Sequence, residues 1–414
     1  MRCEYEKKVF SSIVEFNPQE TLKKGTKAKK IAMDKLQPFC RDITEYEIEE
    51  FKGGSKFRNG DTIMARITPC LENGKTAKVS ILDNNEVGFG STEYIVFRAK
   101  DGVDEDYLYY LVCSNVVREP AIKSMVGSSG RQRVQLDVLK ELEVQLPPYD
   151  IQCRIGNILR CIDDKIELNR KINKNLEEQA VALFRSWFSA FSLFPNSSRV
   201  NSEFGEIPED FSVVKVGSLP ILVTDYVANG SFASLKSNVN LYQEPNYAYF
   251  IRNTDLKSGS FGVFVDQHSY EFLSKSTLYG GEIIISNVGD VGSVFLCPKL
   301  DGLMTLGNNI IMLRPEDDHL HYYLYIWFKY LQGQVLIQGI KGGSAQPKFN
   351  KTDFKNTSVL IPTKDTLSRF HDTVAPMFET ISQRQAENAR LADLRDTLLP
   401  QLISGELDVS ALDI

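Results

Sequence analysis

The stretch KIELNRKINKNLEEQAVALF, from Lys165 to Phe184, decides the architecture of this chain. It contains neither glycine nor proline, so it predicts a long continuous helix. Its apolar residues form a narrow stripe, whereas a helix that packs on a globular core presents a wider apolar face. A narrow stripe is typical of a helix that packs along one partner helix. The stripe in this stretch consists of Ile166, Ile172, Leu176, Ala180 and Leu183, and Ile162 just before it is also expected to pack against the partner helix.

An internal repeat supplies the partner helix. When the sequence is shifted by 215 residues, GSSGRQRVQLDVLKELEVQLPP (127–148) aligns without a gap on GGSAQPKFNKTDFKNTSVLIPT (342–363). The same shift places Ile166 on Ile381 and Leu176 on Leu391, and a shift of 221 aligns NGDTIMARI with GGEIIISNV. Identity is low, but the order and spacing are kept over most of each half, which indicates a duplication.

Each half of the repeat has the same two parts. Short alternating segments such as DTIMARI and EIIISNV, followed by shorter helical patterns, predict an α/β (α+β) domain. A long helix then follows in each half. The predicted divisions are a first domain at 1–148, a spacer helix at 149–191, a linker at 192–205, a second domain at 206–363, a second spacer helix at 364–404 and a tail at 405–414.

The second long helix is the expected partner of the first, and its packing residues are Met377, Ile381, Leu391 and Leu398. A helix of about 40 residues is a rod of roughly 60 Å. Asn173 and Asn388 recur at the same place in the two helices. An asparagine in a helix seam fixes register at some cost in stability. A solvent-facing position explains them equally well, so both interpretations stay open.

The composition favours an ordinary soluble globular protein of the cytoplasm. Hydrophobic residues make up 42% and charged residues 25% of the chain, without an apolar run long enough for a membrane span. The N-terminal stretch lacks the apolar core of a signal peptide. The seven cysteines are scattered without a CxxC pair, which favours reduced thiols and argues against a metal site or a disulfide framework.

Sequence motifs give no case for catalysis. LPPY (146–149) is similar to the Asn-Pro-Pro-Tyr site of amino-methyltransferases, but Leu146 cannot accept the hydrogen bond that the asparagine amide accepts. PCLENGKT (69–76) ends like a phosphate-binding loop, yet Pro69 occupies the place of its first glycine. No combination of nucleophile, base and orienting group is visible. We therefore expect a binding protein without a catalytic site.

The net charge of −6 argues mildly against indiscriminate nucleic-acid binding but does not exclude DNA as the ligand, because local basic clusters are present. KKGTKAKK holds five lysines, and the segments 121–140 and 341–355 each carry a net charge of +3. Serine hydroxyls and loop amides in these loops suit phosphates, arginines suit guanine and glutamines suit adenine. A plain surface loop remains the alternative for any single residue. The candidate DNA-binding residues are Ser128, Ser129, Arg131, Gln132, Arg133, Lys341, Ser344, Gln346 and Lys348.

The sequence resembles the specificity (S) subunits of type I restriction–modification systems. The resemblance covers nearly the whole chain in order and is carried by LPPYDIQCRIGNILRCIDDKIELNRKINKNLEEQAVALFRSWF, GEIIISNVGDVGSVFL and LADLRDTLLPQLISGEL. It implies two target recognition domains on a long antiparallel two-helix coiled coil with pseudo-two-fold symmetry. Each domain would read one half of a bipartite site in double-stranded DNA.

The resemblance also implies partners. Two modification (methyltransferase) subunits would bind along the helices, and restriction (endonuclease/translocase) subunits would join the complex. The cofactors S-adenosylmethionine, ATP and magnesium would belong to those subunits, with none in this chain. An alternative function is a non-catalytic scaffold whose duplicated domains bind proteins; DNA binding would instead weaken steeply with salt. A self-contained nuclease or methyltransferase is opposed by the missing motifs.

Overall fold

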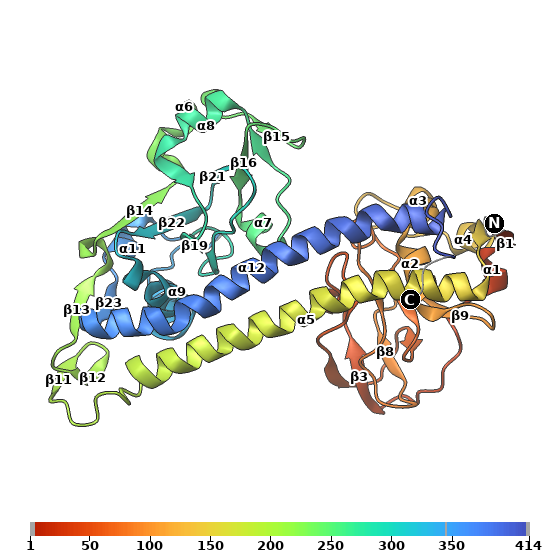
Figure 1. Cartoon of the computed structure of the whole chain (residues 1–414), viewed down its shortest axis with the longest axis horizontal. Helices are drawn as coiled ribbons and strands as arrows, with labels where there is room; N and C mark the ends of the chain where they lie inside the picture. The colour runs from red at the N-terminus through yellow and green to blue at the C-terminus, as the bar shows by residue number, and fades with distance from the viewer. Residues whose placement is uncertain (1–4, 344–345, 411–414) are drawn as a thin grey trace. The chain divides into compact units, whose positions relative to one another are not determined.

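The computed structural model of the chain describes residues 5–343 and 346–410 (Figure 1). Its contacts divide the chain into two compact units. Unit 1 comprises Met1–Arg170 and Glu387–Ile414, and unit 2 comprises Lys171–Ala386. The long helices α5 (Tyr149–Phe188) and α12 (Lys364–Ile403) have 40 residues each, and both are shared between the units. The predicted spacer helices are therefore not bodies separate from the two domains.

The starts of the long helices follow from their local sequence. Pro147 and Pro148 directly precede α5, where proline needs no hydrogen-bond donor and already has a helical φ. The hydroxyl of Thr363, directly before α12, accepts a hydrogen bond of 3.3 Å from the backbone N–H of Thr366. A side-chain oxygen at this place satisfies one of the first backbone donors of a helix.

Among its described residues, unit 1 contains two four-stranded sheets and a separate pair of strands. The first sheet has the order β2 (Val14–Phe16), β9 (Tyr94–Ala99), β6 (Thr62–Ala65) and β7 (Thr76–Lys78), and its pairs are antiparallel. The second has the order β4 (Glu47–Glu50), β3 (Lys27–Ile31), β8 (Gly88–Gly90) and β5 (Lys56–Phe57), with β3 parallel to β8. The separate pair is β1 (Glu6–Val9) with β10 (Glu143–Leu146).

The core of unit 1 joins the first sheet to the long helices. The short helices of unit 1 are α1 (Phe10–Ile13), η1 (Met33–Lys35), α2 (Glu105–Cys113), α3 (Asn115–Lys123) and α4 (Leu136–Lys140). Asp104 caps α2 by accepting a 2.8 Å hydrogen bond from the backbone N–H of Tyr107. One apolar cluster contains residues of α2, of β6 and β9, and of both α5 and α12. Burial of α2 therefore fixes the sheet on the helices.

Unit 2 repeats this plan with one additional strand in its second sheet. Its first sheet has the order β14 (Ile221–Asp225), β22 (Ile310–Pro315), β19 (Ile283–Ser286) and β20 (Val294–Leu296). The second has the order β15 (Leu241–Tyr242), β17 (Phe264–Val265), β16 (Ala248–Ile251), β21 (Leu303–Leu306) and β18 (Thr277–Leu278), with β16 parallel to β21. The pair β13 (Ser212–Lys215) and β23 (Ser358–Ile361) corresponds to β1 and β10.

The helices of unit 2 place its core beside α5 and α12. The short ones are η2 (Val216–Ser218), η3 (Tyr226–Asn229), α6 (Phe232–Asn238), α7 (Asn253–Ser258), α8 (Gln267–Phe272), η4 (Ser274–Ser276), η5 (Asp318–Leu320), α9 (His321–Lys329), α10 (Leu331–Gly339) and α11 (Lys351–Lys355). The sheet containing β19 and β22 lies between the long helices and the other sheet (Figure 1). Phe184 of α5 and Phe370 of α12, 5.8 Å apart between ring centroids, pack beside Tyr323 of α9.

The repeat predicted from the sequence is confirmed by strand order and by backbone bridges. An isolated bridge joins Ile67 to Arg133 in unit 1, and another joins Val288 to Lys348 in unit 2. The first residues of these bridges differ by 221 positions and the second by 215, the two shifts found in the sequence. The strands and the loops thus kept their mutual register while the segment between them changed length.

The segment 192–205, predicted as a polar linker, lies within unit 2 and begins a short hairpin. β11 (Arg199–Ser202) pairs with β12 (Gly205–Pro208) in an antiparallel hairpin, and Ile207 is buried. α5 ends at Phe188 and α12 at Ile403, slightly before the predicted ends at 191 and 404. In the part of the chain that the structure describes, no helix combines the length and apolar character needed to cross a bilayer.

Candidate nucleic-acid interface

The first predicted reading loop is a hairpin loop closed by two backbone hydrogen bonds. Val126 and Arg133 exchange N–H···O bonds of 3.1 and 2.9 Å, and the N–H of Arg131 donates to the carbonyl of Ser128 at 2.9 Å. Gly130, with φ of +77°, provides a conformation that other residues rarely adopt. Ser128, Ser129, Arg131 and Arg133 are exposed, and Gln132 is half-buried. The loop therefore brings all five predicted residues of unit 1 together on the surface.

Backbone contacts attach this loop to the end of strand β6. The N–H of Thr68 donates to the carbonyl of Gln132 at 3.0 Å, and the N–H of Val134 donates to the carbonyl of Arg66 at 2.9 Å. The fully buried Val134 side chain fixes the start of the following segment in the core. The loop is thus held at the edge of a sheet by main-chain bonds that do not depend on its exposed side chains.

Arg133 makes a bidentate ion pair with Glu93. Its Nε lies 3.1 and 3.0 Å from the two carboxylate oxygens, and its Nη2 lies 2.7 Å from Oε1. The Arg133 hydrogen bonds hold the pKa of the Glu93 carboxyl below its usual value, with a further contribution from the charge of Arg66. Within the described residues, the side chain of Arg131 forms neither a hydrogen bond nor an ion pair. Arg131 is therefore the more accessible cation for phosphate.

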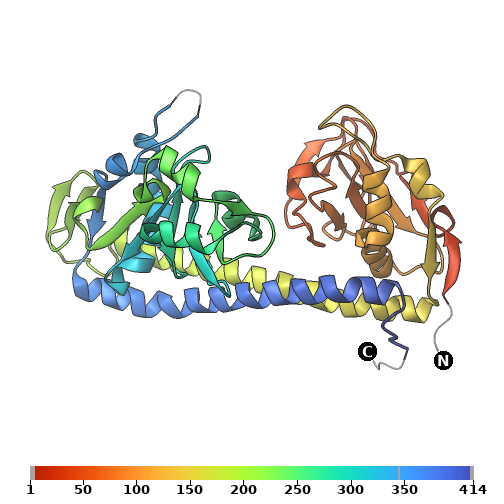
Figure 2. The same ribbon diagram turned by 90° about the horizontal axis from the view of Figure 1, so that it is seen from above.

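The second predicted loop has the same construction. Gly342 and Lys348 exchange backbone hydrogen bonds of 2.8 and 2.9 Å. The N–H of Gly289 donates to the carbonyl of Pro347, and the N–H of Phe349 donates to the carbonyl of Asn287. Figure 2 shows this loop, in blue, at the margin of unit 2 away from α12. Two segments with little sequence identity thus attach to the same end of the corresponding strand.

The predicted residues of the second loop are exposed, with one exception that the structure does not describe. Lys341, Gln346 and Lys348 all lie on the surface. The Lys341 ammonium is 3.4 Å from the side-chain oxygen of Gln338. Ser344 lies outside the described residues. At the 215-residue shift Lys348 stands where unit 1 has Arg133, and Gln346 stands where it has Arg131. The cations of this loop are therefore point charges without a planar fork.

Two charged residues next to the first loop were missed from the sequence. Arg66 directly follows β6 and Glu93 directly precedes β9, and these two strands are paired. Their side chains therefore lie at one sheet edge, with Arg66 Nε 3.9 Å from Glu93 Oε2. Charged residues at the adjoining ends of two segments predicted to pair were the signal available in NGDTIMARI and GSTEYIVFRA.

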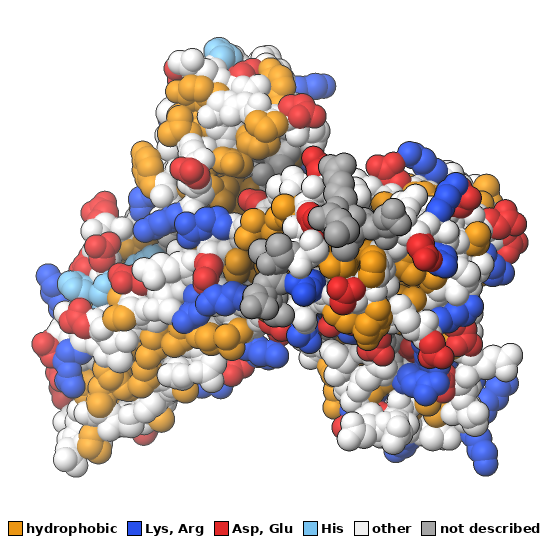
Figure 3. Space-filling model, turned by 45° about the vertical axis from the view of Figure 1, so that its right-hand side comes forward, with side chains coloured by type: hydrophobic (Ala, Val, Ile, Leu, Met, Phe, Trp, Pro, Cys, Tyr) orange, Lys and Arg blue, Asp and Glu red, His pale blue; other side chains and the backbone are white. Residues whose placement is uncertain are grey.

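The lysine-rich segment 23–30 divides into paired and exposed side chains. Lys29 is buried and makes 3.0 Å ion pairs with Asp83 and Glu86, and Lys30 pairs with Glu49. Lys23, Lys24 and Lys27 are exposed. Figure 3 shows basic and acidic side chains interspersed on the visible face. The segment is therefore less basic than its sequence indicated.

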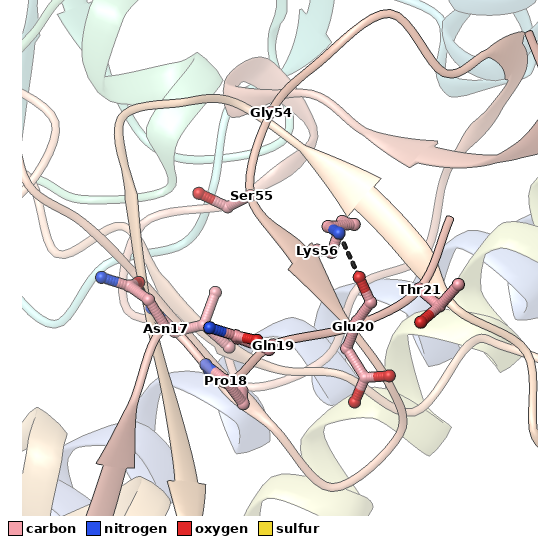
Figure 4. Close-up of a pocket in the computed structure, with 9 residues that line it drawn as sticks. Asn17, Pro18, Gln19, Glu20, Thr21, Gly54, Ser55 and Lys56 are labelled. Carbon is pink, nitrogen blue, oxygen red and sulfur yellow. Dashed lines mark hydrogen bonds between the residues drawn. The ribbon is translucent and has the colours of Figure 1, made fainter. Parts of the chain in front are cut away.

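The charged side chains that line a polar pocket in unit 1 also have hydrogen-bond or ion-pair partners within the protein. It is lined by residues of two segments, Asn17–Thr21 and Gly54–Lys56 (Figure 4). The Lys56 ammonium donates to the backbone carbonyl of Glu20. The Glu20 carboxylate pairs with Arg58 and Arg98, each at 2.7 Å. Metal-binding clusters of three or more His, Cys, Asp or Glu residues are also absent from the described residues.

Contacts between α5 and α12 recur at the asparagines singled out in the sequence. In unit 1 the amide of Asn388 donates to the carbonyl of Ile166 at 3.4 Å. In unit 2 the amide of Asn173 donates to the carbonyl of Ile381 at 3.5 Å. Because both asparagines and both isoleucines are 215 residues apart, these are the same contact in the two units. Both asparagines lie between the helices, as the seam interpretation requires.

The residues predicted to pack in this seam are buried to different degrees. Ile166 is 4% exposed. Leu183, Met377 and Ile381 pack against the core of unit 2, and Leu398 packs against that of unit 1. Ile162, Ile172, Leu176 and Leu391 are half-buried. The stripe therefore also serves the domain cores, in addition to the contact between helices.

The chain is similar in sequence to known DNA specificity subunits. The family described as the type I restriction modification DNA specificity domain matches residues 4–178 and 208–388. The chain is 30% identical over 327 residues to the MjaIX specificity subunit of Methanocaldococcus jannaschii, covering 76% of this chain and 71% of that one. It is 25% identical to the HindI specificity subunit of Haemophilus influenzae, covering 87% and 90%.

A solved structure supports the fold. The S subunit of a type I restriction–modification system from M. genitalium superposes with a TM-score of 0.52 at 16% identity. The superposition covers 99% of this chain and 97% of that one. The mixed helix and strand architecture described above is therefore shared along the whole length of both proteins.

Proposed function

The chain belongs to the type I restriction–modification DNA specificity family, and from this premise we propose that each unit reads one half of a bipartite DNA site. As a specificity subunit the chain recognises DNA sequence with two domains and is itself not an enzyme. The recurrence of one exposed polar loop at the same strand end in both units carries the proposal. The loop after α3 in unit 1 and the loop after α10 in unit 2 are the readers.

Each loop contains residues suited to phosphate contacts, which position the protein, and residues suited to base contacts, which read the sequence. Backbone amides and the hydroxyls of Ser128, Ser129 and Ser344 suit phosphate oxygens, which fix the register of the protein on DNA. The forked guanidinium groups of Arg131 and Arg133 suit guanine O6 and N7, and the amides of Gln132 and Gln346 suit adenine. Lys341 and Lys348 would add attraction to phosphate in the second half-site.

We further propose that α5 and α12 form an antiparallel coiled coil that sets the distance between the half-sites. The reciprocal contacts of Asn173 with Ile381 and of Asn388 with Ile166 support this arrangement, because reciprocity of this kind is typical of a two-fold interface. A protein with pseudo-two-fold symmetry matches the dyad of a DNA duplex. The helices would then determine the length of the unread gap.

The reaction chemistry would come from partner subunits. Two modification subunits would bind along α5 and α12, and endonuclease/translocase subunits would join them in the cytoplasm. S-adenosylmethionine, ATP and magnesium would be bound by those subunits. The chain's own contribution is to position the complex, so its residues need to bind and orient DNA without transferring a group.

Mapping of methylated adenine tests the proposal. The chain is co-expressed with its modification subunits in a methylation-free host, and methyladenine is located across the genome. We expect a two-part motif with a fixed gap. A chain with one heptad inserted in both α5 and α12 should methylate the same half-sites with a longer gap.

Two outcomes would contradict parts of the proposal. An unaltered gap in the heptad variant would overturn the coiled coil as a spacer, even if both half-sites were confirmed. Absence of methylation by a folded, assembled complex would overturn DNA reading itself. The two results are distinct because the first requires a mapped motif and the second excludes one.

A further inference from the structure

The geometry of the Arg133–Glu93 pair points to a specificity-determining role for Glu93. A guanidinium has five N–H donors arranged along two usable edges. Glu93 occupies the edge formed by Nε and Nη2, with contacts of 2.7–3.1 Å. Within the described residues, neither a hydrogen bond nor an ion pair engages Nη1. The edge formed by Nη1 and Nη2 therefore remains available to a second acceptor pair.

Resting on the proposed function, we propose that Glu93 is a positioning residue that restricts Arg133 to reading guanine. Guanine offers two acceptors, O6 and N7, that match one edge of the fork. A carboxylate on the other edge holds the fork still, so less conformational entropy is lost on binding. It also neutralises the charge that would otherwise attract any phosphate, regardless of sequence.

The surroundings of Glu93 support a built arrangement and not an incidental surface pair. Its backbone carbonyl accepts a 2.9 Å bond from the N–H of Arg66, and its own N–H donates to the Ser91 hydroxyl at 3.1 Å. The Glu93 side chain is only 24% exposed. The carboxylate is thus fixed at the end of β9, and the backbone bridge from Arg133 to Ile67 fixes its partner.

Unit 2 has no carboxylate–guanidinium pair at the position equivalent to Glu93 and Arg133. The N–H of Asn287 donates to the carbonyl of Asn309, as that of Arg66 donates to Glu93, so Asn309 takes the place of Glu93. Lys348 takes the place of Arg133. Its ammonium forms no ion pair with any of the residues that the structure describes. Guanine discrimination through a held fork is therefore expected in the first half-site alone.

The test compares complexes of the full chain with its modification subunits on two DNA duplexes. One duplex carries the mapped motif and the other a scrambled sequence, and affinity is measured at several salt concentrations. Glu93→Gln should lower the ratio of specific to non-specific affinity by about 10-fold or more, the scale of one bidentate base contact. Affinity for the scrambled duplex should rise, and its salt slope should steepen by ~0.9 for one added phosphate contact.

Matched variants separate positioning from charge and from folding. Glu119→Gln removes the same charge from the exposed Lys123 pair of unit 1 and should leave the affinity ratio unchanged. Arg133→Lys keeps the charge but lacks the fork, so adding Glu93→Gln to it should have no further effect on the ratio. Replacing guanines of the first half-site by 7-deazaguanine should cost affinity in the wild type and much less in Glu93→Gln.

The outcomes distinguish this inference from the proposed function. A wild-type complex that discriminates, with a Glu93→Gln complex that discriminates equally and has the same salt slope, overturns the role of Glu93 alone. An equal loss at both half-sites also overturns it, because the Arg133–Glu93 pair is present only in unit 1. A wild-type complex that binds both duplexes equally overturns the proposed function, and this inference with it.

Discussion

The two units solve the same packing problem with differently placed charges. In unit 1, Asp163 of α5 accepts a 2.8 Å hydrogen bond from Arg395 of α12 and a 2.7 Å hydrogen bond from the Tyr110 hydroxyl. The residues 215 positions away in unit 2 are Phe378 for Asp163, Tyr325 for Tyr110 and Ala180 for Arg395. There the rings of Tyr325 and Phe378 meet edge to face at 5.5 Å. The Tyr325 hydroxyl donates at 2.7 Å to Glu177 of α5, which forms an ion pair with Lys329.

The difference shows how a duplicated interface can replace a buried salt bridge by an aromatic contact and place its ion pair at a more exposed position. Removing two charges from water costs several kcal/mol, and their attraction offsets that cost only with good geometry. Asp163 is 4% exposed, so the pair of unit 1 is intolerant of losing one member. In unit 2 the ion pair lies between Glu177 and Lys329, whose side chains are more exposed to solvent, so losing one member should cost less there. We expect unit 1 to respond more strongly than unit 2 to single polar changes.

The largest loss of stability is expected from Arg395→Ala. It leaves the Asp163 carboxylate buried without its cation, so the free energy of unfolding of unit 1 should fall by about 3–5 kcal/mol. Amide hydrogen exchange in α2 during urea unfolding would locate the loss. Arg390→Ala, at an exposed position on the same helix, should change stability by roughly 0.5 kcal/mol or less. Equal effects of the two variants would contradict a structural role for the pair.

The aromatic contact of unit 2 can be transplanted into unit 1. A variant combining Asp163→Phe, Arg395→Ala and Tyr110→Phe removes both charges and leaves no buried hydroxyl without its acceptor. It should recover the stability lost in Arg395→Ala and reach between roughly neutral and about 2 kcal/mol above the wild type. Urea unfolding of all three proteins measures this. A variant as unstable as Arg395→Ala would mean that the surroundings, not the pair, determine the preference.

A smaller difference is expected from pH, because all four histidines belong to unit 2. Burial lowers the pKa of His321, whose ring nitrogen lies 2.5 Å from the carbonyl of Gly281. The unfolded chain then binds more protons than the folded one. Stability is therefore present above about pH 6.5 and is lost as the pH falls toward the folded pKa, by at most ~1.4 kcal/mol per pH unit.

Unfolding of each unit at pH 7.5 and pH 5.5 would measure this effect. Fluorescence of Trp187 and Trp327 reports on unit 2 alone, since both tryptophans lie there. Unit 2 should lose stability and unit 1 should change less. His321→Gln keeps an amide donor for the Gly281 carbonyl and should reduce the pH dependence of unit 2. Equal pH dependence of both units would show that burial of His321 is not its cause.

Sequence reasoning predicted the parts of this molecule that repeat and missed those that differ between repeats. The shifts of 215 and 221 located both loops, both helices and the seam asparagines, because repetition preserves register even where residues change. Glu93 and Asp163 were not found, since their partners Arg133 and Arg395 are distant in sequence and have no charged equivalent pair in the other half. The pairing of β11 with β12 was missed because polar strands in a short hairpin lack an alternating apolar signal.

The division of the chain has a consequence for its synthesis. Unit 2 is one uninterrupted segment, whereas the core of unit 1 includes Leu402 and Ile403 from the far end of α12, and the Tyr5 hydroxyl donates to the carbonyl of Leu402 at 3.2 Å. A ribosome adding about 5–20 residues per second needs roughly 10 to 40 s to make the 216 residues of unit 2. Throughout that interval the apolar face of unit 1 lacks its closing helix and Asp163 lacks Arg395. The domain that emerges first is therefore the one completed last, because its closing helix is synthesised after unit 2.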